Sequence, residues 1–306
     1  MDIRRYIVGV DGSVPARAAI RWAMTRAREG GEVVLVHVAD DEWGAIGSRL
    51  VDEADQDARQ RLDTELSYAR SLDEPVPVAV RGALRTGSPM AELASFSDAL
   101  TMLVVGTHKT GFHYGRAFGS RSLQLANLAT GPVAIIPEVE SRMRRGVVVG
   151  VDDTPAGYAA IDWGADLACD HHCELMVVRS STVRTMIRAD IDIDEQLNDW
   201  QNRRDDEARG LLGMALDRAR RRQPGIVIRS RVVRRPAGAA LNELARSAEL
   251  LVIGDSRRAD AQLGSLGAVA YDVLLNLSSP TIVVHAPESI ERPRQQNTQG
   301  GHHVIG

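Results

Sequence analysis

The sequence is poor in the features that mark secreted, membrane-spanning or nucleic-acid-binding proteins. Two cysteines among 306 residues are too few for a disulfide-stapled scaffold and suit a reducing cytoplasm. No apolar run approaches the roughly 20 residues that span a bilayer, and the first residues lack a secretory apolar segment. The net charge of −4 gives no general reason to expect nucleic-acid binding. We therefore expect a cytoplasmic protein that binds neither membranes nor nucleic acid.

The length of 306 residues exceeds one typical domain and favours two. An internal repeat supports this number. The apolar run Tyr6–Asp11 returns as Val147–Asp152 after 152 − 11 = 141 positions, and Leu103–Gly106 returns as Leu251–Gly254 after 254 − 106 = 148 positions. A duplicated domain is the simplest explanation. We predict domains at 1–138 and 146–287, separated by a polar linker and followed by a disordered tail at 288–306.

Short apolar strands alternate with amphipathic helices in each copy. In the first copy the expected strands are 6–11, 33–38, 76–80, 103–105 and 132–136, and the expected helices are 16–27, 50–72, 87–99 and 119–129. Pro75 and Pro77 confine the third strand to one end of the sheet or to a looser pairing. Strands that are apolar on both faces and alternate with helices predict a parallel sheet covered on both sides. The fold class is therefore α/β, with two tandem, doubly wound, five-stranded, Rossmann-like domains.

Glycine recurs where the fourth strand of each copy ends and where the next helix begins. These residues are Gly106 with Gly119 and Ser120 in the first copy, and Gly254 with Gly267 in the second. Backbone N–H groups at such a corner can bind a phosphate, although glycine can also serve conformation alone. In open parallel sheets, ligands bind beyond the carboxyl ends of the strands, where the strand order reverses. Asp11 also ends a strand, and this shared location favours a ligand site.

The repeated pattern resembles the tandem universal stress proteins, which carry two such domains in one chain. The similarity lies in the first strand ending in Val-Gly-Val-Asp-Gly-Ser, the fourth ending in Val-Val-Gly with Gly-Ser downstream, and the Gly-Pro-Val before the fifth. It covers about residues 4–137 and 146–286. The resemblance implies an adenine nucleotide alpha hydrolase-like fold. It also implies an ATP site, with Mg²⁺ as a candidate companion, in which the fourth-strand loop holds the phosphates and ribose.

The resemblance also assigns residues to that site. Transferred one by one, they are Asp11, Gly106, Gly119 and Ser120 in the first copy, and Asp152, Gly254 and Gly267 in the second. Gly9, His108 and Gly150 are further candidates beside them. Lys109 and Arg257 replace the second loop glycine of the family, and Ala268 replaces its hydroxyl residue. A long side chain there can block the backbone from the phosphates or contact them itself. We expect the first copy to be the better site.

Each of these side chains also has a purely structural interpretation. Asp11 and Asp152 suit the start of a helix, where carboxylates are stabilised. Ser120 suits a helix cap, and a solvated loop position explains His108 equally well. Cys169 and Cys173 enclose two histidines, but this spacing matches no common zinc site, so no metal site is predicted.

Three functions remain open from the sequence. The first is an ATP-binding regulator or signalling module of the stress response. The second is an enzyme that hydrolyses ATP or transfers nucleotidyl groups. His-x-Gly-His, Ser-Gly-Gly-x-Asp-Ser and Walker motifs are all absent, so we assign no catalytic residue and expect at most weak ATP hydrolysis. The third is a nucleotide-free scaffold that acts by dimerising.

The resemblance finally implies how the domains pair. The last strands of the two copies, Val133–Ile136 and Thr281–Val284, are apolar edges that pairing would cover. We expect the copies to pack with pseudo-twofold symmetry through these strands. A homodimer of chains and an unidentified protein partner are further expectations.

Overall fold

The computed structural model describes ten segments of the chain. They are residues 3–27, 30–39, 48–72, 77–107, 111–113, 116–118, 120–138, 144–182, 193–256 and 266–286, with only the backbone course considered for 48–54, 111–120 and 193–198. The predicted site residues His108, Lys109, Gly119 and Arg257 lie outside the described residues, as do the linker at 139–143 and the tail from 287.

The two copies repeat one order of strands and helices. The first contains β1 (Arg5–Gly9), α1 (Val14–Met24), β2 (Glu32–Ala39), α2 (Ser48–Arg70), β3 (Ala79–Thr86), α3 (Pro89–Ala94), β4 (Thr101–Thr107), β5 (Gly111–His113), β6 (Arg116–Phe118), α4 (Ser120–Leu128) and β7 (Val133–Pro137). The second contains β8 (Val147–Gly150), α5 (Pro155–Asp170), β9 (Leu175–Ser180), α6 (Ile193–Arg222), β10 (Ile228–Val233), α7 (Ala237–Ala245), β11 (Leu250–Gly254), α8 (Ala268–Leu275) and β12 (Thr281–Val284).

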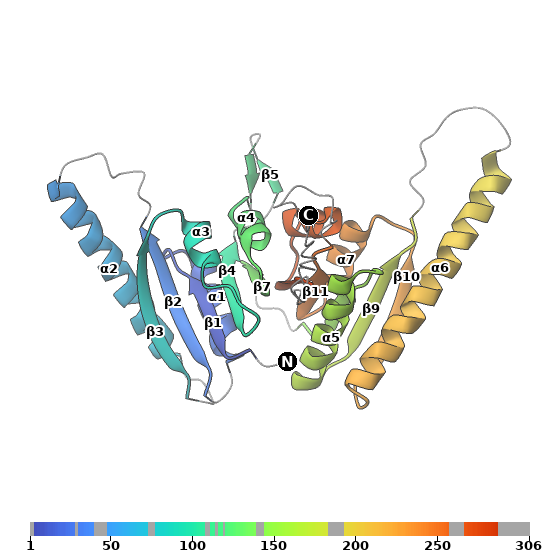
Figure 1. The fold of residues 1–306 in the computed structure, drawn as a ribbon, viewed down its shortest axis with the longest axis horizontal. Helices are drawn as coiled ribbons and strands as arrows, with labels where there is room; N and C mark the ends of the chain where they lie inside the picture. Colours follow the sequence, from blue (N-terminus) through green and yellow to red (C-terminus); the bar gives the residue numbers. More distant parts are fainter. Residues whose placement is uncertain are drawn as a thin grey trace, which may run out of the picture.

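One sheet of ten strands runs through both halves in the order β10-β9-β8-β11-β12-β7-β4-β1-β2-β3. Neighbouring strands are parallel within each half, whereas β12 and β7 pair antiparallel, with Thr281 opposite Ile135 and Val283 opposite Val133. Figure 1 shows the halves on either side of this central pair. The predicted pairing through the last strands is therefore confirmed. In each half the strand order reverses between the first and fourth strands, which defines the switch point.

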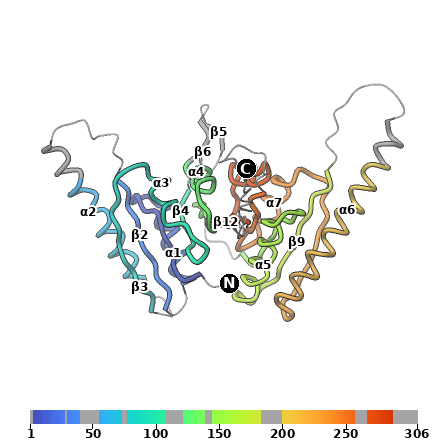
Figure 2. Tube along the Cα trace, viewed as in Figure 1, coloured from blue at the N-terminus to red at the C-terminus, as the bar shows by residue number. Residues whose placement is uncertain are grey.

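Helices cover the sheet on both faces and enclose two apolar cores. The first core joins α1, α2, α5 and α6 to the sheet and contains Trp22, Leu66, Ile161 and Leu212. The second core gathers the buried side chains of α3, α4, α7 and α8, such as Leu125 and Leu274. The two halves meet at the pair of β7 and β12, which we call the seam. Both cores continue across this seam. Figure 2 shows the long helices α2 and α6 at the two outer ends of the molecule.

The first helix of each half begins with the same cap. The Ser13 hydroxyl accepts a hydrogen bond from the Ala16 N–H, and the Thr154 hydroxyl accepts one from the Gly157 N–H. A proline follows in the first turn of both helices, where its missing N–H costs nothing. The caps fix the chain as it leaves the first strand, which places Asp11 and Asp152 at the carboxyl edge of the sheet.

Two predicted boundaries are wrong for identifiable reasons. The expected third strand at 76–80 is displaced to β3 (Ala79–Thr86), which pairs with β2 along its length. Pro77 precedes the ladder because proline has no N–H to donate, while the charged segment beyond Val80 belongs to an edge strand with exposed arginines. The expected helix at 87–99 shortens to α3 (Pro89–Ala94), since Gly87 has a φ of +136° and Asp98 accepts the Leu100 N–H in a turn.

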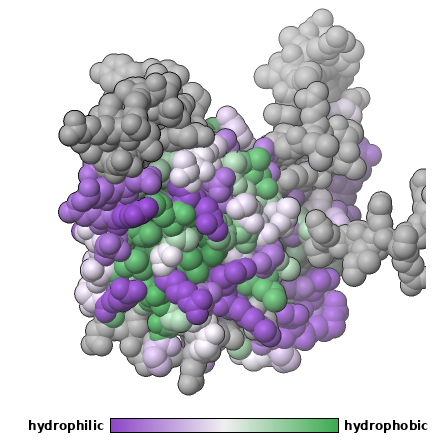
Figure 3. Space-filling model, turned by 60° about the vertical axis from the view of Figure 1, so that its left-hand side comes forward, coloured by the Kyte–Doolittle hydropathy of each residue, from purple (hydrophilic) through white to green (hydrophobic). Residues whose placement is uncertain are grey.

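The surface of the first half mixes apolar and hydrophilic residues. Figure 3 shows apolar residues gathered near the middle of one face, with hydrophilic residues around them. Helix α3 has only six residues. Val34 and Ala83 of the neighbouring strands β2 and β3 remain half-buried beside the second core.

Within the described segments, no helix is both long and apolar enough to cross a membrane.

Candidate functional site

A cavity opens at the switch point of the first half. Its volume is about 620 Å³, including the open mouth. Its walls come from the carboxyl ends of β1, β2 and β4 and from the starts of α1, α3 and α4. The polar or charged side chains at its walls are Asp11, Ser13, His37, Arg121 and Ser122.

Asp11 and His37 form the polar rim of this cavity. The Asp11 carboxylate is exposed and accepts a hydrogen bond of 3.0 Å from the Ser13 N–H. The His37 Nδ1 lies 2.8 Å from the Val10 carbonyl oxygen. Because a carbonyl only accepts, this contact places a proton on Nδ1 and leaves Nε2 of a neutral ring as an acceptor. The rim thus offers carboxylate and imidazole acceptors to a ligand's hydroxyl or amino groups.

Gly106 allows β4 to approach the first turn of α1. A Cβ added there would lie 2.1 Å from the Pro15 carbonyl oxygen. The equivalent Cβ at Gly254 would lie 2.5 Å from the Ala156 carbonyl carbon. These contacts are with backbone atoms, which cannot move aside as a flexible side chain can. Close packing by itself therefore requires glycine at both positions, whether or not a ligand binds. This packing joins the floor of each cavity to the start of the adjacent helix.

Gly9 and Gly150 leave room beside the first strand of each half for a leucine of a covering helix, α3 in the first half and α7 in the second. Added Cβ atoms would lie 2.8 Å from the Leu93 Cδ1 and 2.7 Å from the Leu241 Cδ1. Both leucines also line the cavities. These glycines therefore let an apolar wall close over the end of the strand.

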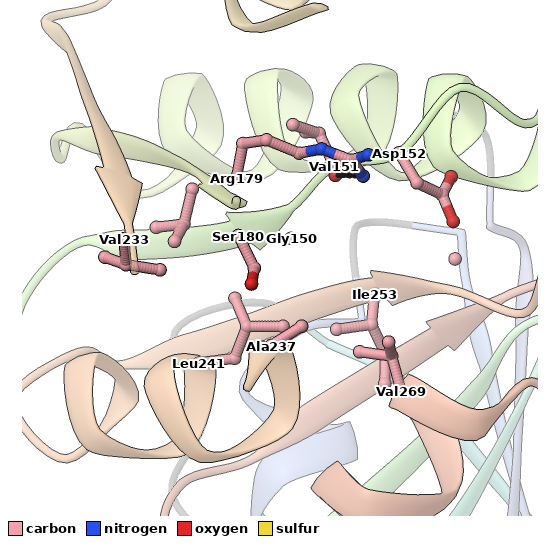
Figure 4. A pocket seen from close by; sticks show the side chains of 12 residues that line it. Gly150, Val151, Asp152, Arg179, Ser180, Val233, Ala237, Leu241, Ile253 and Val269 are labelled. Carbon is pink, nitrogen blue, oxygen red and sulfur yellow. Dashed lines mark hydrogen bonds between the residues drawn. The ribbon is translucent and has the colours of Figure 1, made fainter. Parts of the chain in front are cut away.

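The second half has a corresponding cavity of about 480 Å³. Its walls are mostly apolar, and Figure 4 shows Leu241, Ile253 and Val269 facing Arg179 and Asp152 across it. Arg179 occupies the position of His37 and donates from Nη1 to the Val151 carbonyl oxygen at 3.0 Å, as His37 contacts Val10. The register supports this equivalence, because Gly9 pairs with Val36 and Gly150 pairs with Val178.

Asp152 is more enclosed by hydrogen bonds than Asp11. The Thr154 hydroxyl donates to its Oδ1 at 2.5 Å, and the Ser256 hydroxyl donates to its Oδ2. Beyond Gly254, the buried Asp255 carboxylate accepts the Gly267 N–H at 3.0 Å. The second half therefore satisfies its polar groups internally where the first half leaves Asp11 exposed.

The fold of the two halves occurs in a known protein family. Residues 2–137 and 143–285 match the universal stress protein family, one match for each half. The chain belongs to the universal stress protein family. Universal stress protein Rv1996 of Mycobacterium tuberculosis is 29% identical over 313 residues, which cover 92% of this chain and 95% of that protein.

Solved structures agree with this fold. A universal stress protein from Archaeoglobus fulgidus superposes with a TM-score of 0.64 at 13% identity, covering 94% of this chain and 98% of its own. A universal stress protein in complex with cAMP is 27% identical, covering 48% of this chain and 100% of its own, with a TM-score of 0.36.

In this universal stress protein, only some of the predicted site residues belong to the described part of the chain. Gly9, Asp11 and Gly106 meet around the first cavity, and Gly150, Asp152 and Gly254 meet around the second. Gly267 lies near the second site through Asp255. The backbone of α4 starts at Ser120, whose side chain is outside the described atoms, as are all of His108, Lys109, Gly119 and Arg257. Their roles stay predictions.

Sequence reasoning missed two residues that line these cavities, His37 and Arg179. It also missed the pair of Asp255 and His285, which lies beyond Gly254. His37 and Arg179 follow the residue that pairs with the glycine of the first strand, and this pairing is not visible in the sequence, where the two residues differ in type. Asp255 directly follows Gly254 where the first copy has Thr107. A charged residue at the buried end of a central strand is itself a signal.

The cysteine–histidine segment serves the contact between the halves. His171 Nδ1 lies 2.7 Å from Glu249 Oε1, and Arg26 of the first half donates to the same oxygen at 2.9 Å. Among the described residues, no group of three or more cysteine, histidine, aspartate or glutamate side chains is placed to hold a metal ion.

Proposed function

We propose that this universal stress protein binds ATP in its first half and acts as a nucleotide-responsive regulator of a cytoplasmic stress response. The cavity of about 620 Å³ at the first switch point carries this proposal. It combines an exposed carboxylate at one side, Asp11, with a cationic side chain at the start of α4, Arg121. An adenine nucleotide offers hydroxyls to the first and phosphates to the second.

The residues present fit an adenine nucleotide in one orientation. Asp11 would accept from the ribose hydroxyls, and the apolar wall that includes Met90 and Leu93 would cover the base. Gly106 would direct the phosphates toward the start of α4, and His108, Lys109, Gly119 and Ser120 are proposed to supply the remaining contacts. Mg²⁺, if bound, would be held chiefly by the phosphates and water rather than by a protein cage.

Isothermal titration of the full chain with ATP tests the proposal. Wild-type protein should release or absorb heat, and Asp11→Ala should weaken binding by about ten-fold or more, since a charged hydrogen bond contributes about 1.5–3 kcal/mol. Asp63→Ala is the matched control, because Asp63 is an exposed carboxylate on α2 away from the cavity. Absence of binding by the wild-type chain would reject the ATP site.

A nucleotide-free scaffold is the second candidate function. Gly106 and Gly254 both have packing roles that need no ligand, which favours it. The seam already uses both last strands within one chain, so a homodimer would need another surface, and gel filtration with light scattering would detect it. An unidentified protein partner belongs to both candidates.

Enzymatic turnover is not part of the proposed function. The cavity places no nucleophile beside a base among its described residues. We expect at most slow ATP hydrolysis. Steady-state phosphate release that falls sharply in Asp11→Ala would argue for an enzyme instead.

A further inference from the structure

The two halves differ at a pair of neighbouring positions at the ends of their fourth and fifth strands. An offset of 254 − 106 = 148 positions aligns Gly106 with Gly254 and therefore Thr107 with Asp255. The same offset aligns Pro137 with His285. Thr107 and Pro137 face each other in the register of β4 and β7, so Asp255 and His285 replace a neighbouring pair. The second half thus carries two ionisable groups where the first carries none.

Asp255 is held inside the second half by groups from the end of β12 and the start of α8. Its side chain is fully buried, its N–H donates to the Val284 carbonyl oxygen, and its Oδ1 accepts the Gly267 N–H at 3.0 Å. Its Oδ2 lies 3.3 Å from Nδ1 of the nearly buried His285. Gly267 precedes the first residue of α8, and free backbone N–H groups at a helix start are the groups that bind a phosphate. A carboxylate of the chain therefore occupies an anion position at this corner.

At the second cavity itself, side chains of the chain take up room beside Asp152. Asp152 accepts hydrogen bonds from Thr154 and Ser256, whereas Asp11 accepts one, from Ser13, among the described residues. Arg179 extends along Val151 toward Asp152 in Figure 4, where the first half has the shorter His37. The second cavity is correspondingly smaller, about 480 Å³ against about 620 Å³.

A triphosphate would meet an unfavourable environment at Asp255. It would lose the Gly267 N–H as a donor unless that hydrogen bond broke, which would leave a buried carboxylate short of a partner. This cost opposes phosphate and leaves uncharged parts of a ligand unaffected, so the position acts on specificity.

We infer that Asp255 excludes nucleotide polyphosphates from the second half and limits this chain to one bound ATP. The inference rests on the proposed ATP site of the first half for its stoichiometry, but the role of Asp255 can be tested separately. Thr107 occupies the equivalent position in the first half, where it does not exclude a polyphosphate.

Exchange of residues between the two halves provides the test. Full-length wild-type protein is titrated with ATP in a calorimeter, and we expect a stoichiometry of one. The variant carrying Asp255→Thr and His285→Pro installs the residues of the first half and should raise the stoichiometry to two. Thr107→Asp should weaken the first site by at least about ten-fold, because a desolvated like charge costs several kcal/mol. Thermal unfolding confirms that each variant is folded.

A second measurement needs no variant. Wild-type protein is photolabelled with azido-ATP and the labelled peptides are identified by mass spectrometry. Labels confined to residues before 139 support the inference, and a label between 146 and 286 that ATP displaces overturns it.

The outcomes separate the inference from the proposed function. A wild-type stoichiometry of two overturns the inference and leaves the ATP site of the first half intact. A wild-type stoichiometry of zero with binding gained by the exchange at Asp255 supports the inference and rejects the first site. No binding by either protein rejects both.

Discussion

Arg26 and Glu249 join the two halves across 223 positions of the chain. The Arg26 Nη2 donates to Glu249 Oε1 at 2.9 Å, and the Arg26 guanidinium also lies 4.2 Å from the centre of the Trp22 ring. His171 reaches the same carboxylate oxygen from the end of α5. Burial lowers the pKa of Arg26, although an arginine remains protonated at neutral pH. The carboxylate therefore compensates a buried cation at the seam.

Removing the charge of Glu249 should weaken this contact between the halves. Glu249→Gln leaves the Arg26 cation without its carboxylate, and we expect the free energy of unfolding to fall by about 1–3 kcal/mol. Urea unfolding followed by circular dichroism measures the loss. Asp55→Asn is the control, because its ion pair with Arg59 is exposed at 3.8 Å and should matter by less than about 0.5 kcal/mol. Equal losses in the two variants would contradict the role of the contact.

Asp166 should make stability depend on acid pH. Burial alone would raise its pKa, but hydrogen bonds from Arg222 and Gln223 prevail and hold the pKa at about 2, against an ordinary value of 3.8. A carboxyl whose pKa is lower in the folded state stabilises the fold above its unfolded pKa. That contribution, about 2 kcal/mol, is lost as the pH falls from about 4 toward 2.

Unfolding of Asp166→Asn at a series of pH values tests this dependence. The variant should be less stable than wild type at pH 6, and the difference should shrink as the pH approaches 2. A difference that stays constant from pH 6 to pH 2 would show that the ionised carboxylate is not responsible.

Gly106 should not tolerate even one methyl group. In Gly106→Ala the new Cβ would meet the Pro15 carbonyl oxygen at 2.1 Å, and we expect a destabilisation of about 1–3 kcal/mol from the forced shift of α1. Gly210→Ala is the matched control. Gly210 lies exposed inside α6 with open space around its Cβ position, so alanine there should stabilise the protein by about 0.5–1 kcal/mol. Unfolding midpoints of both variants would test the contrast.

The separated first half should dimerise. Residues 1–138 expressed alone would expose β7, whose five residues are all buried in the intact chain against β12. An unpaired apolar edge strand is a template for pairing with a second copy. Light scattering should give twice the mass of the fragment. A folded monomer would show that the seam is dispensable.

Much of the fold could be predicted because local sequence patterns determine it. The apolar runs and the glycine stops fix the strands, and the repeat at offsets of 141 and 148 positions fixes the duplication. The boundary of β3 could not be predicted in this way, because its charged residues become a strand only by pairing with β2. The boundaries of such an edge strand are set by its pairing with the neighbouring strand and not by the local preference of its residues.

The places of Gly9, Asp11 and Gly106 at the first cavity, and of Gly150, Asp152 and Gly254 at the second, could be predicted because these residues lie at or next to strand ends in the sequence. Their roles stay predictions. His37 and Arg179 could not be predicted, because they join the cavities only when β2 and β9 align beside the first strands. Asp255 and His285 are 30 positions apart and meet only through the pairing of β11 with β12. Groups that depend on strand register need the three-dimensional structure.

The antiparallel ladder between β7 and β12 has a consequence for behaviour at low protein levels. Two separate chains would dissociate on dilution, whereas the partners here are tied together and meet at an effective concentration that is typically millimolar for a short linker. Their association is therefore independent of how much protein the cell makes. One copy of this chain suffices to present both halves in fixed relation.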